Sequence, residues 1–236
     1  MFFDIQYAIK QFPVILEGAP MTLLIAVVAM LFGAVIGFLL TLCRMYKVPV
    51  LNRLAMLYIS FIRGTPILVQ IYIIFFGIQL IFELIVQAMG WNASTSSIPC
   101  LLYAFAAFSI NAGAFLSETI RSALSSVEAG QMEAAYSVGL STAQAMRRII
   151  IPQALVSALP NLGNAFLLLI KGSSLAFTVM VVEILSKAKI EAGAGYRYTE
   201  NFVVASIIYW GMCFIFEKVF VLLENRLKRY KHEITI

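Results

Sequence analysis

The chain has 236 residues, of which 61% are hydrophobic and 12% charged, and its mean hydropathy is +0.92. This composition excludes an ordinary soluble domain and indicates a protein that lies mostly in the bilayer. The net charge of +5 does not indicate a nucleic-acid partner, because cytoplasmic loops of membrane proteins collect Lys and Arg. The cysteines are odd in number and lie in separate apolar segments, which favours packing roles over a metal site. They are Cys43, Cys100 and Cys213.

The N-terminal segment before Pro20 mixes apolar with charged residues and predicts a helix on the outer surface of the membrane. Five later runs approach or exceed the roughly 18 to 20 residues that cross the hydrocarbon core as a helix. They cover about 20–43, 64–87, 98–120, 159–185 and 201–223. The first has no small-residue cleavage site after it, so we interpret it as a retained span. The sequence therefore predicts an all-α, polytopic membrane protein whose residues 1–236 form one domain.

Basic residues gather in alternate connections and predict the topology. They follow the first span, the third span and the fifth span: Arg44, Lys47, Arg53; Arg121, Arg147, Arg148; Arg226, Lys228, Arg229, Lys231. The positive-inside rule then puts the N-terminus outside and the C-terminus in the cytoplasm. The two outer connections, 91–99 and 186–200, are rich in Gly, Ser and Asn and are predicted to be exposed loops.

Two local patterns lie in the first and second spans. Gly33 and Gly37 have the small-xxx-small spacing that allows close helix contact, which we interpret as packing within the chain rather than a dimer seam. Arg63-Gly64-Thr65-Pro66 weakens a continuous helix at the start of the second span. Arg63 either reaches the headgroups at the cytoplasmic boundary or belongs to a kinked entrance that lines a translocation route.

Residues 122–158 contain no run able to cross the membrane and are long for a bare connection. They predict two cytoplasmic helices. The first runs from about 126 to 138 and is stopped by Gly139, and the second begins at Ser141 with Gln144 in a capping-box pattern. Pro152 closes the second helix or bends the chain back into the bilayer. Spacing alone fits a helix in a partner's groove and a helix on anionic lipid equally well.

The stretch EAAYSVGLSTAQAMRRIIIP, with Glu133, Ala134, Ala135, Gly139 and Pro152, resembles the EAA loop of permease subunits of ATP-binding-cassette importers. The stretches FIRGTPILVQIY, FLSETIRSALSSVEAGQMEAA and LIKGSSL are similar to the polar amino acid uptake branch of that family. The family often has Leu at position 151, Gly at 122, and an acidic residue and Thr at 172 and 173. Here those positions hold Ile151, Ser122, Gly172 and Ser173.

The resemblance implies a non-catalytic permease subunit of the inner membrane of a bacterium. Its loop at Glu133 to Pro152 would dock on a cytoplasmic dimer of ABC ATPases, which bind the ATP and Mg²⁺. It further implies a second permease subunit, identical or paralogous, an extracellular solute-binding protein and an amino-acid solute. No cofactor is expected on this chain, which has no phosphate-binding loop, and whose one histidine, His232, lies in the tail.

Polar residues inside spans indicate where a solute could pass, because a charge facing lipid is costly. Asn111 and Glu118 share one face of the third span, and Asn164, Lys171, Ser174 and Thr178 recur at helical spacing in the fourth. Lys171 could meet a substrate carboxylate or form a structural ion pair. Glu118 could hold an amino group or be a boundary residue. Gln70 and Ser173 are pathway candidates that fit packing roles as well.

An ion-coupled secondary transporter is the main alternative. It would be expected to show internal repeats and to act alone, whereas this chain has an odd number of predicted spans and a loop suited to a partner. An intramembrane enzyme would want paired acidic or His residues at one depth. A scaffold that merely anchors a cytoplasmic protein would bind an ATPase without transport.

Overall fold

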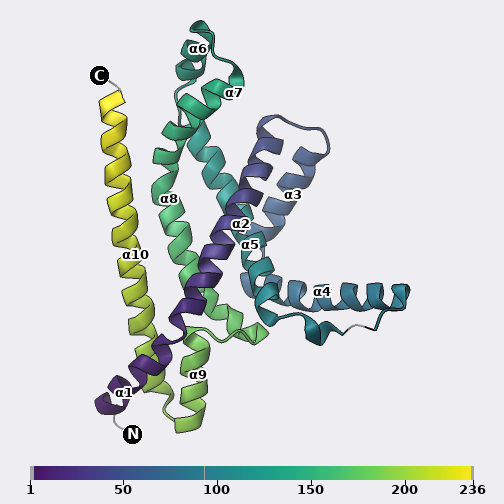
Figure 1. The fold of residues 1–236 in the computed structure, drawn as a ribbon, viewed down its shortest axis with the longest axis vertical. Helices are drawn as coiled ribbons and strands as arrows, with labels where there is room; N and C mark the ends of the chain where they lie inside the picture. Colours follow the sequence, from purple (N-terminus) through teal and green to yellow (C-terminus); the bar gives the residue numbers. More distant parts are fainter. Residues whose placement is uncertain (1–2, 93, 235–236) are drawn as a thin grey trace.

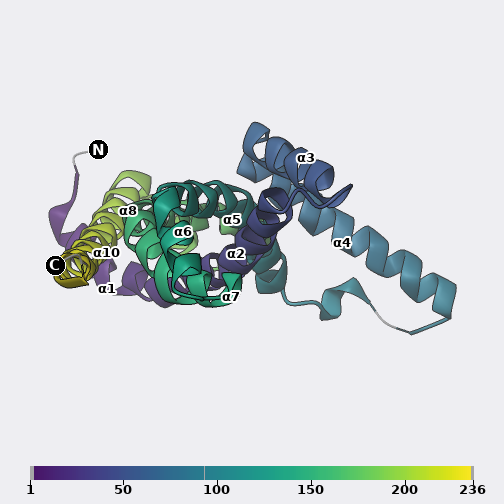
Figure 2. The same ribbon diagram turned by 90° about the horizontal axis from the view of Figure 1, so that it is seen from above.

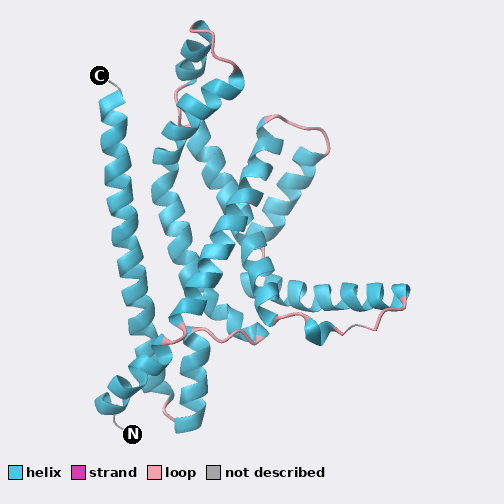
Figure 3. Cartoon of the chain, in the orientation of Figure 1, coloured by secondary structure: helices cyan, strands magenta, loops and turns pink. Residues whose placement is uncertain are grey.

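The computed structural model describes residues 3–92 and 94–234, with side chains to position 228, and these residues form helices joined by short connections (Figure 3). The helices in chain order are α1 Ile5–Leu16, α2 Ala19–Met45, α3 Leu51–Gly64, α4 Ile67–Met89, η1 Thr95–Ser97, α5 Cys100–Ser125, α6 Ala129–Ser137, α7 Thr142–Ala145, the π turn η2 Met146–Ile150, α8 Ile151–Gly172, the 3₁₀ helix η3 Ser173–Val179, α9 Ile184–Gly195 and α10 Tyr198–Ile234. The predicted all-α class is confirmed. The side chains of Arg229, Lys231 and His232 lie outside the described part.

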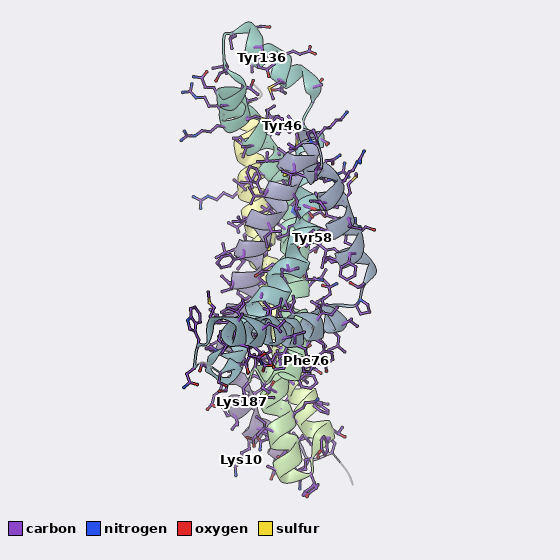
Figure 4. The ribbon with its side chains drawn as sticks, turned by 90° about the vertical axis from the view of Figure 1, so that its right-hand side faces the viewer. Lys10, Tyr46, Tyr58, Phe76, Tyr136 and Lys187 are labelled. Atoms are coloured by element: carbon purple, nitrogen blue, oxygen red, sulfur yellow. The ribbon has the colours of Figure 1, made fainter. Side chains whose placement is uncertain are left out.

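Five helical stretches of the described residues are long and apolar enough to cross a membrane. They are Ala19–Met45, Ile67–Met89, Cys100–Ser125, Thr142–Val179 and Tyr198–Lys228. The polar loop of residues 126–150, with α6 and α7, is called the coupling loop after its predicted role, and it lies at the same end of the molecule as the C-terminal end of α10 (Figure 1). The N-terminal helix and α9 lie at the opposite end, where Lys10 and Lys187 are found, far from Tyr136 of the coupling loop (Figure 4).

The centre of the molecule is α5, which packs along α2 and is flanked by α8 (Figure 1). Small residues bring α2 and α5 close together. A Cβ at Gly33 would lie 2.6 Å from the Cβ of Ala112, and one at Gly37 only 2.8 Å from the backbone nitrogen of Ser117. Thr41 then donates a hydrogen bond to the Ser117 carbonyl at 2.9 Å. The glycine pair is thus intramolecular packing, as the sequence predicted.

The second predicted span, 64–87, corresponds to helix α4, and a separate helix, α3, precedes it. Helix α3 ends at Gly64, Thr65 is extended, and Pro66 precedes α4, so the chain turns a corner at the Arg63 to Pro66 stretch. Helix α4 runs across the direction of α2, α5 and α8 and reaches away from the rest of the chain (Figures 1 and 2). Only 11% of the residues in the most apolar part of α4 are buried, against 56% in that of α5. Most of α4 is therefore left for lipid or another chain to cover.

The fourth span differs from its predicted bounds, 159–185, at both ends. Helix α8 starts at Ile151, eight residues before the predicted limit of 159, because Pro152 occupies the first turn, where its missing N–H costs nothing. The π turn Met146–Ile150 directly precedes it. At the other end the α-helix gives way to η3 at Ser173 instead of continuing to 185.

The outer connection predicted at 186–200 is wrong, because most of it is helix α9. The Glu183 carboxylate caps the helix by accepting from Ser186 N at 2.9 Å. Ile184, Ala188 and Ala192 recur every fourth residue and are fully buried. The Gly residues that suggested a loop are exposed on the other sides of this helix, which packs on α1 and α10.

Helix α1 is held at the same end by charged contacts. Asp4 caps α1 by accepting from Tyr7 N at 3.0 Å, and Arg197 reaches the same carboxylate at 2.6 Å. These two hydrogen bonds hold the pKa of Asp4 below its usual range. The predicted N-terminal surface helix is therefore present, and it is tied to the start of α10.

Candidate functional site

A cavity of about 530 Å³ lies between the α3–α4 corner, α5 and α8, and it is open on one side of the single chain. Its size falls within the range of small-molecule sites. Its walls are mainly apolar, from residues such as Phe108, Phe115 and Leu169. Set among these are seven polar or charged side chains: Arg63, Thr65, Asn111, Glu118, Thr119, Asn161 and Asn164. A cavity of this kind can hold and orient a small polar solute.

The corner that forms one wall is braced by Gln70. This side chain is 3% exposed, and its amide nitrogen donates to the carbonyl of Ile62 at 2.8 Å and to the hydroxyl of Thr65 at 2.8 Å. Its amide oxygen accepts from Asn111 Nδ2 at 2.8 Å, which joins the corner to α5. Gln70 therefore satisfies backbone groups freed where the helix breaks, and it positions two residues that face the cavity.

Glu118 faces the cavity with both oxygens already paired. Oε1 accepts from Arg44 on α2 at 2.5 Å, and Oε2 accepts from Arg121 one turn further along α5 at 2.8 Å. The side chains of Glu118 and Arg44 are only 23% and 19% exposed. Because the cluster is partly buried, removing one partner would leave a poorly solvated charge.

Arg63, in contrast, has no ion-pair partner among the described side chains. Its guanidinium lies 5.8 Å from the ring centroid of Phe115, a cation–π distance, and both residues line the cavity. Of the two alternatives for Arg63, the structure places it in the wall of the cavity beside the kinked corner.

Three predicted pathway residues, Asn111, Glu118 and Asn164, meet at this cavity. Gln70 lies behind its wall. The remaining candidates, Lys171, Ser173, Ser174 and Thr178, are not part of the lining. Lys171 is exposed at the end of α8 rather than in mid-helix.

The expected helical spacing from Asn164 to Thr178 fails because α8 changes to a 3₁₀ helix at Ser173. A 3₁₀ helix has three residues per turn, so the faces after Gly172 rotate relative to those before it. The three hydroxyl groups there bond locally to the backbone. Ser173 donates to Ile170 O, Ser174 to Lys171 O and Thr178 to Leu175 O, at 2.7, 2.8 and 2.7 Å.

Thr65, Thr119 and Asn161 line the cavity but were not among the pathway residues predicted from the sequence. Asn161 lies three residues before Asn164, so it could have been found by extending the polar spacing of the fourth span toward the coupling loop. Thr119 directly follows Glu118. Thr65 could not have been found in this way, because its place at the cavity depends on the corner between α3 and α4.

The coupling loop has the predicted capped form. Gly139 has φ of +79°, and its N–H bonds to Tyr136 O at 2.9 Å, which ends α6. Ser141 and Gln144 form a reciprocal capping box. Helix α6 begins at Ala129, three residues after the predicted start.

The residues of the EAA stretch divide between the inside and the outside of this loop. Glu133, Ala134 and Gly139 are exposed, whereas Ala135 is 1% exposed and packs inside the helix pair. Arg147 and Arg148 border a surface hollow together with Ala143 and Gln144. The loop therefore presents two acidic side chains, Glu128 and Glu133, and two basic ones on its folded short helices.

A helical chain whose described part has five helices long enough to span a membrane, a mainly apolar cavity that contains polar side chains and a folded polar loop at one end has the form of a polytopic transport protein. Residues 29–229 match the family model described as "Binding-protein-dependent transport system inner membrane component". The chain therefore belongs to this family, the permease subunits of importers driven by an ATP-binding cassette.

Individual relatives cover nearly the whole chain. "Probable amino-acid ABC transporter permease protein PatM" of Vibrio harveyi is 39% identical over 97% of this chain and 98% of its own length. "L-cystine transport system permease protein TcyL" of Bacillus subtilis is 39% identical over 94% and 90%. A solved structure, "Crystal structure of an amino acid ABC transporter with histidines", superposes with a TM-score of 0.80 at 34% identity and covers 96% of this chain and all of that one.

Proposed function

We propose that this chain forms the solute pathway of an importer for a polar amino acid. The cavity between the α3–α4 corner, α5 and α8 is the observation that carries the proposal, because it sets amide, hydroxyl and charged groups inside a membrane domain. A free amino acid fits its volume with room for water. The names of the relatives, which refer to amino acids and to cystine, support the same class of solute.

The pathway would be completed by a second permease subunit, a copy of this chain or a paralogue. Helix α8 exposes a row of polar side chains, Ser157, Asn161, Asn164 and Lys171, which Leu168 interrupts, and Asn161 and Asn164 of this row also line the cavity. Such a row would be costly against lipid, so another polar surface or water must cover it. A second permease that places its own row opposite would enclose a polar route between the two chains.

Transport would be powered from outside this chain. A cytoplasmic dimer of ATPase subunits would bind ATP and Mg²⁺ and grip the coupling loop, where Glu133, Ala134, Gly139, Arg147 and Arg148 are exposed. An extracellular solute-binding protein would deliver the amino acid at the end that carries α1 and α9. This arrangement puts the coupling loop and the C-terminus in the cytoplasm of a bacterium, with the permease in its inner membrane.

The test is reconstitution in proteoliposomes of the permease with its ATPase and its receptor, followed by uptake of labelled amino acids. We expect uptake that requires ATP, the receptor and the ATPase together. Uptake by the permease alone, driven by an ion gradient, would contradict the proposal and favour a secondary transporter. Binding of the ATPase without uptake of any amino acid would favour a scaffold.

A further inference from the structure

The charges around the cavity are unbalanced. Arg63 and Glu118 are the two charged residues that line it within the described part of the chain. Glu118 is already held by Arg44 and Arg121, at 2.5 and 2.8 Å. Two guanidinium groups thus hold the one carboxylate, and a third, that of Arg63, lies beside Phe115 with no ion-pair partner among the described side chains.

Resting on the proposed function, we propose that this cavity selects neutral or acidic amino acids and excludes cationic ones, with Arg63 binding the solute carboxylate. A guanidinium offers paired donors that match a carboxylate, and the partly apolar walls strengthen that contact relative to water. A solute with a net positive charge would instead meet the excess positive charge of the cluster, in which each Glu118 oxygen is already ion-paired with a guanidinium.

Neutral groups in the cavity can hold the rest of such a solute. Asn111 uses its amide nitrogen to donate to Gln70, so its amide oxygen is available to accept from an ammonium group. Asn161 and Asn164 add two further amides on α8, and Thr65 and Thr119 add hydroxyl groups. The α-ammonium of a zwitterion therefore finds acceptors, whereas a second, side-chain cation finds no ionised partner.

The test measures binding of labelled L-glutamine, L-glutamate and L-arginine to the permease–ATPase complex in nanodiscs, without the receptor, so that the receptor's own selectivity does not enter. We expect L-glutamine or L-glutamate to bind at least tenfold more tightly than L-arginine. Arg63→Gln should weaken that binding at least tenfold, and Arg63→Lys should restore part of it. The matched control is Arg53→Gln, an exposed arginine on the same helix that does not line the cavity.

A second variant tests the proposed exclusion of cationic amino acids by a gain of binding. Arg121→Gln frees one oxygen of Glu118 and removes one positive charge, and Arg121 is the more exposed partner, at 43%. We expect this variant to bind L-arginine several-fold more tightly than the parent does. L-Arginine binding as tight as L-glutamine binding in the parent, or unchanged binding in Arg63→Gln, would overturn the inference. Failure of the proposed function differs, since the reconstituted transporter would then take up no amino acid at all.

Discussion

At Gly37 the backbone of α2 passes so close to α5 that no side chain fits. An added Cβ would lie 2.8 Å from Ser117 N and 3.0 Å from the carbonyl carbon of Leu116. Both are backbone atoms, which cannot rotate away as a side-chain tip can. The position therefore fixes the spacing of the two helices, and with it the α5 face that carries Asn111 and Glu118 into the cavity.

Gly37→Ala should lower the stability of the folded chain by about 1–3 kcal/mol, because α2 and α5 must move apart. The measurement is the apparent unfolding temperature in detergent. Gly77→Ala is the matched control, since a Cβ at Gly77, within α4, meets nothing within 4 Å. That variant should be neutral or slightly stabilising. Equal unfolding temperatures for the two variants would contradict the close-contact role of Gly37.

Individual site residues could be predicted where a regular α-helix presents them. Asn111 and Glu118 lie seven residues apart on α5, and the structure brings both to the cavity. Ser174 and Thr178 were predicted from the same helical spacing, but the helix that carries them changes from 3.6 to three residues per turn. The pairing of Glu118 with Arg44 was not foreseen either, because it joins residues 74 positions apart.

Among the helical elements, the coupling loop is specified by local signals. Gly139 has φ of +79°, and no neighbouring atom would contact a Cβ there, so backbone conformation alone demands glycine. The capping box at Ser141 then starts the next helix. Both features could be predicted because each depends on residues no more than five positions apart.

Gly139→Val should insert in the membrane normally but lose solute-stimulated ATP hydrolysis in the reconstituted complex. A β-branched residue is strained at this φ, so the turn between α6 and α7 would rearrange and shift Glu133 and Arg147 relative to each other. Gly130→Val is the matched control, because Gly130 lies within α6 at negative φ with open space around it. Normal stimulation in Gly139→Val would argue against the coupling role.

Helices α9 and α3 show where local signals were insufficient. Helix α9 depends on burial of Ile184, Ala188 and Ala192 against α1 and α10, which supplies stability that its Gly and Lys content does not suggest. The end of α3 was recognised as a weak point from Gly64 and Pro66. The direction in which α4 then leaves depends on Gln70 bonding to Ile62, Thr65 and Asn111, which spacing does not reveal.

On the scale of the whole molecule, the exposed polar side chains of α8 and the largely uncovered α4 fit the proposed second permease subunit. Two of these side chains, Asn161 and Asn164, line the cavity. The number and order of the spans were predictable from hydropathy, since each is a long apolar run. Which faces a partner subunit covers could not be predicted, because that requires the helices to be placed around the cavity first.

Asn161→Cys, in a chain whose three native cysteines are replaced, should cross-link to a second permease subunit in membranes. The expected product is a band of two permease masses after treatment with a short thiol cross-linker. Leu31→Cys is the matched control, because Leu31 is 63% exposed on the apolar surface of α2 and should face lipid. Cross-linking from Leu31 but not from Asn161 would place the second subunit on a different face.

The π turn at Met146–Ile150 and the continuous helix beyond it have a mechanical consequence. No loop separates the coupling loop from the cavity on this side, since the chain is helical from Thr142 to Gly172. Ala145 and Asn164 are about 28 Å apart along such a helix. Tilting the helix by about 10° about one end would move its other end by about 5 Å over that length. A movement of the coupling loop can therefore be passed along α8 to the cavity. How much of the movement reaches the cavity depends on the stiffness of the π turn.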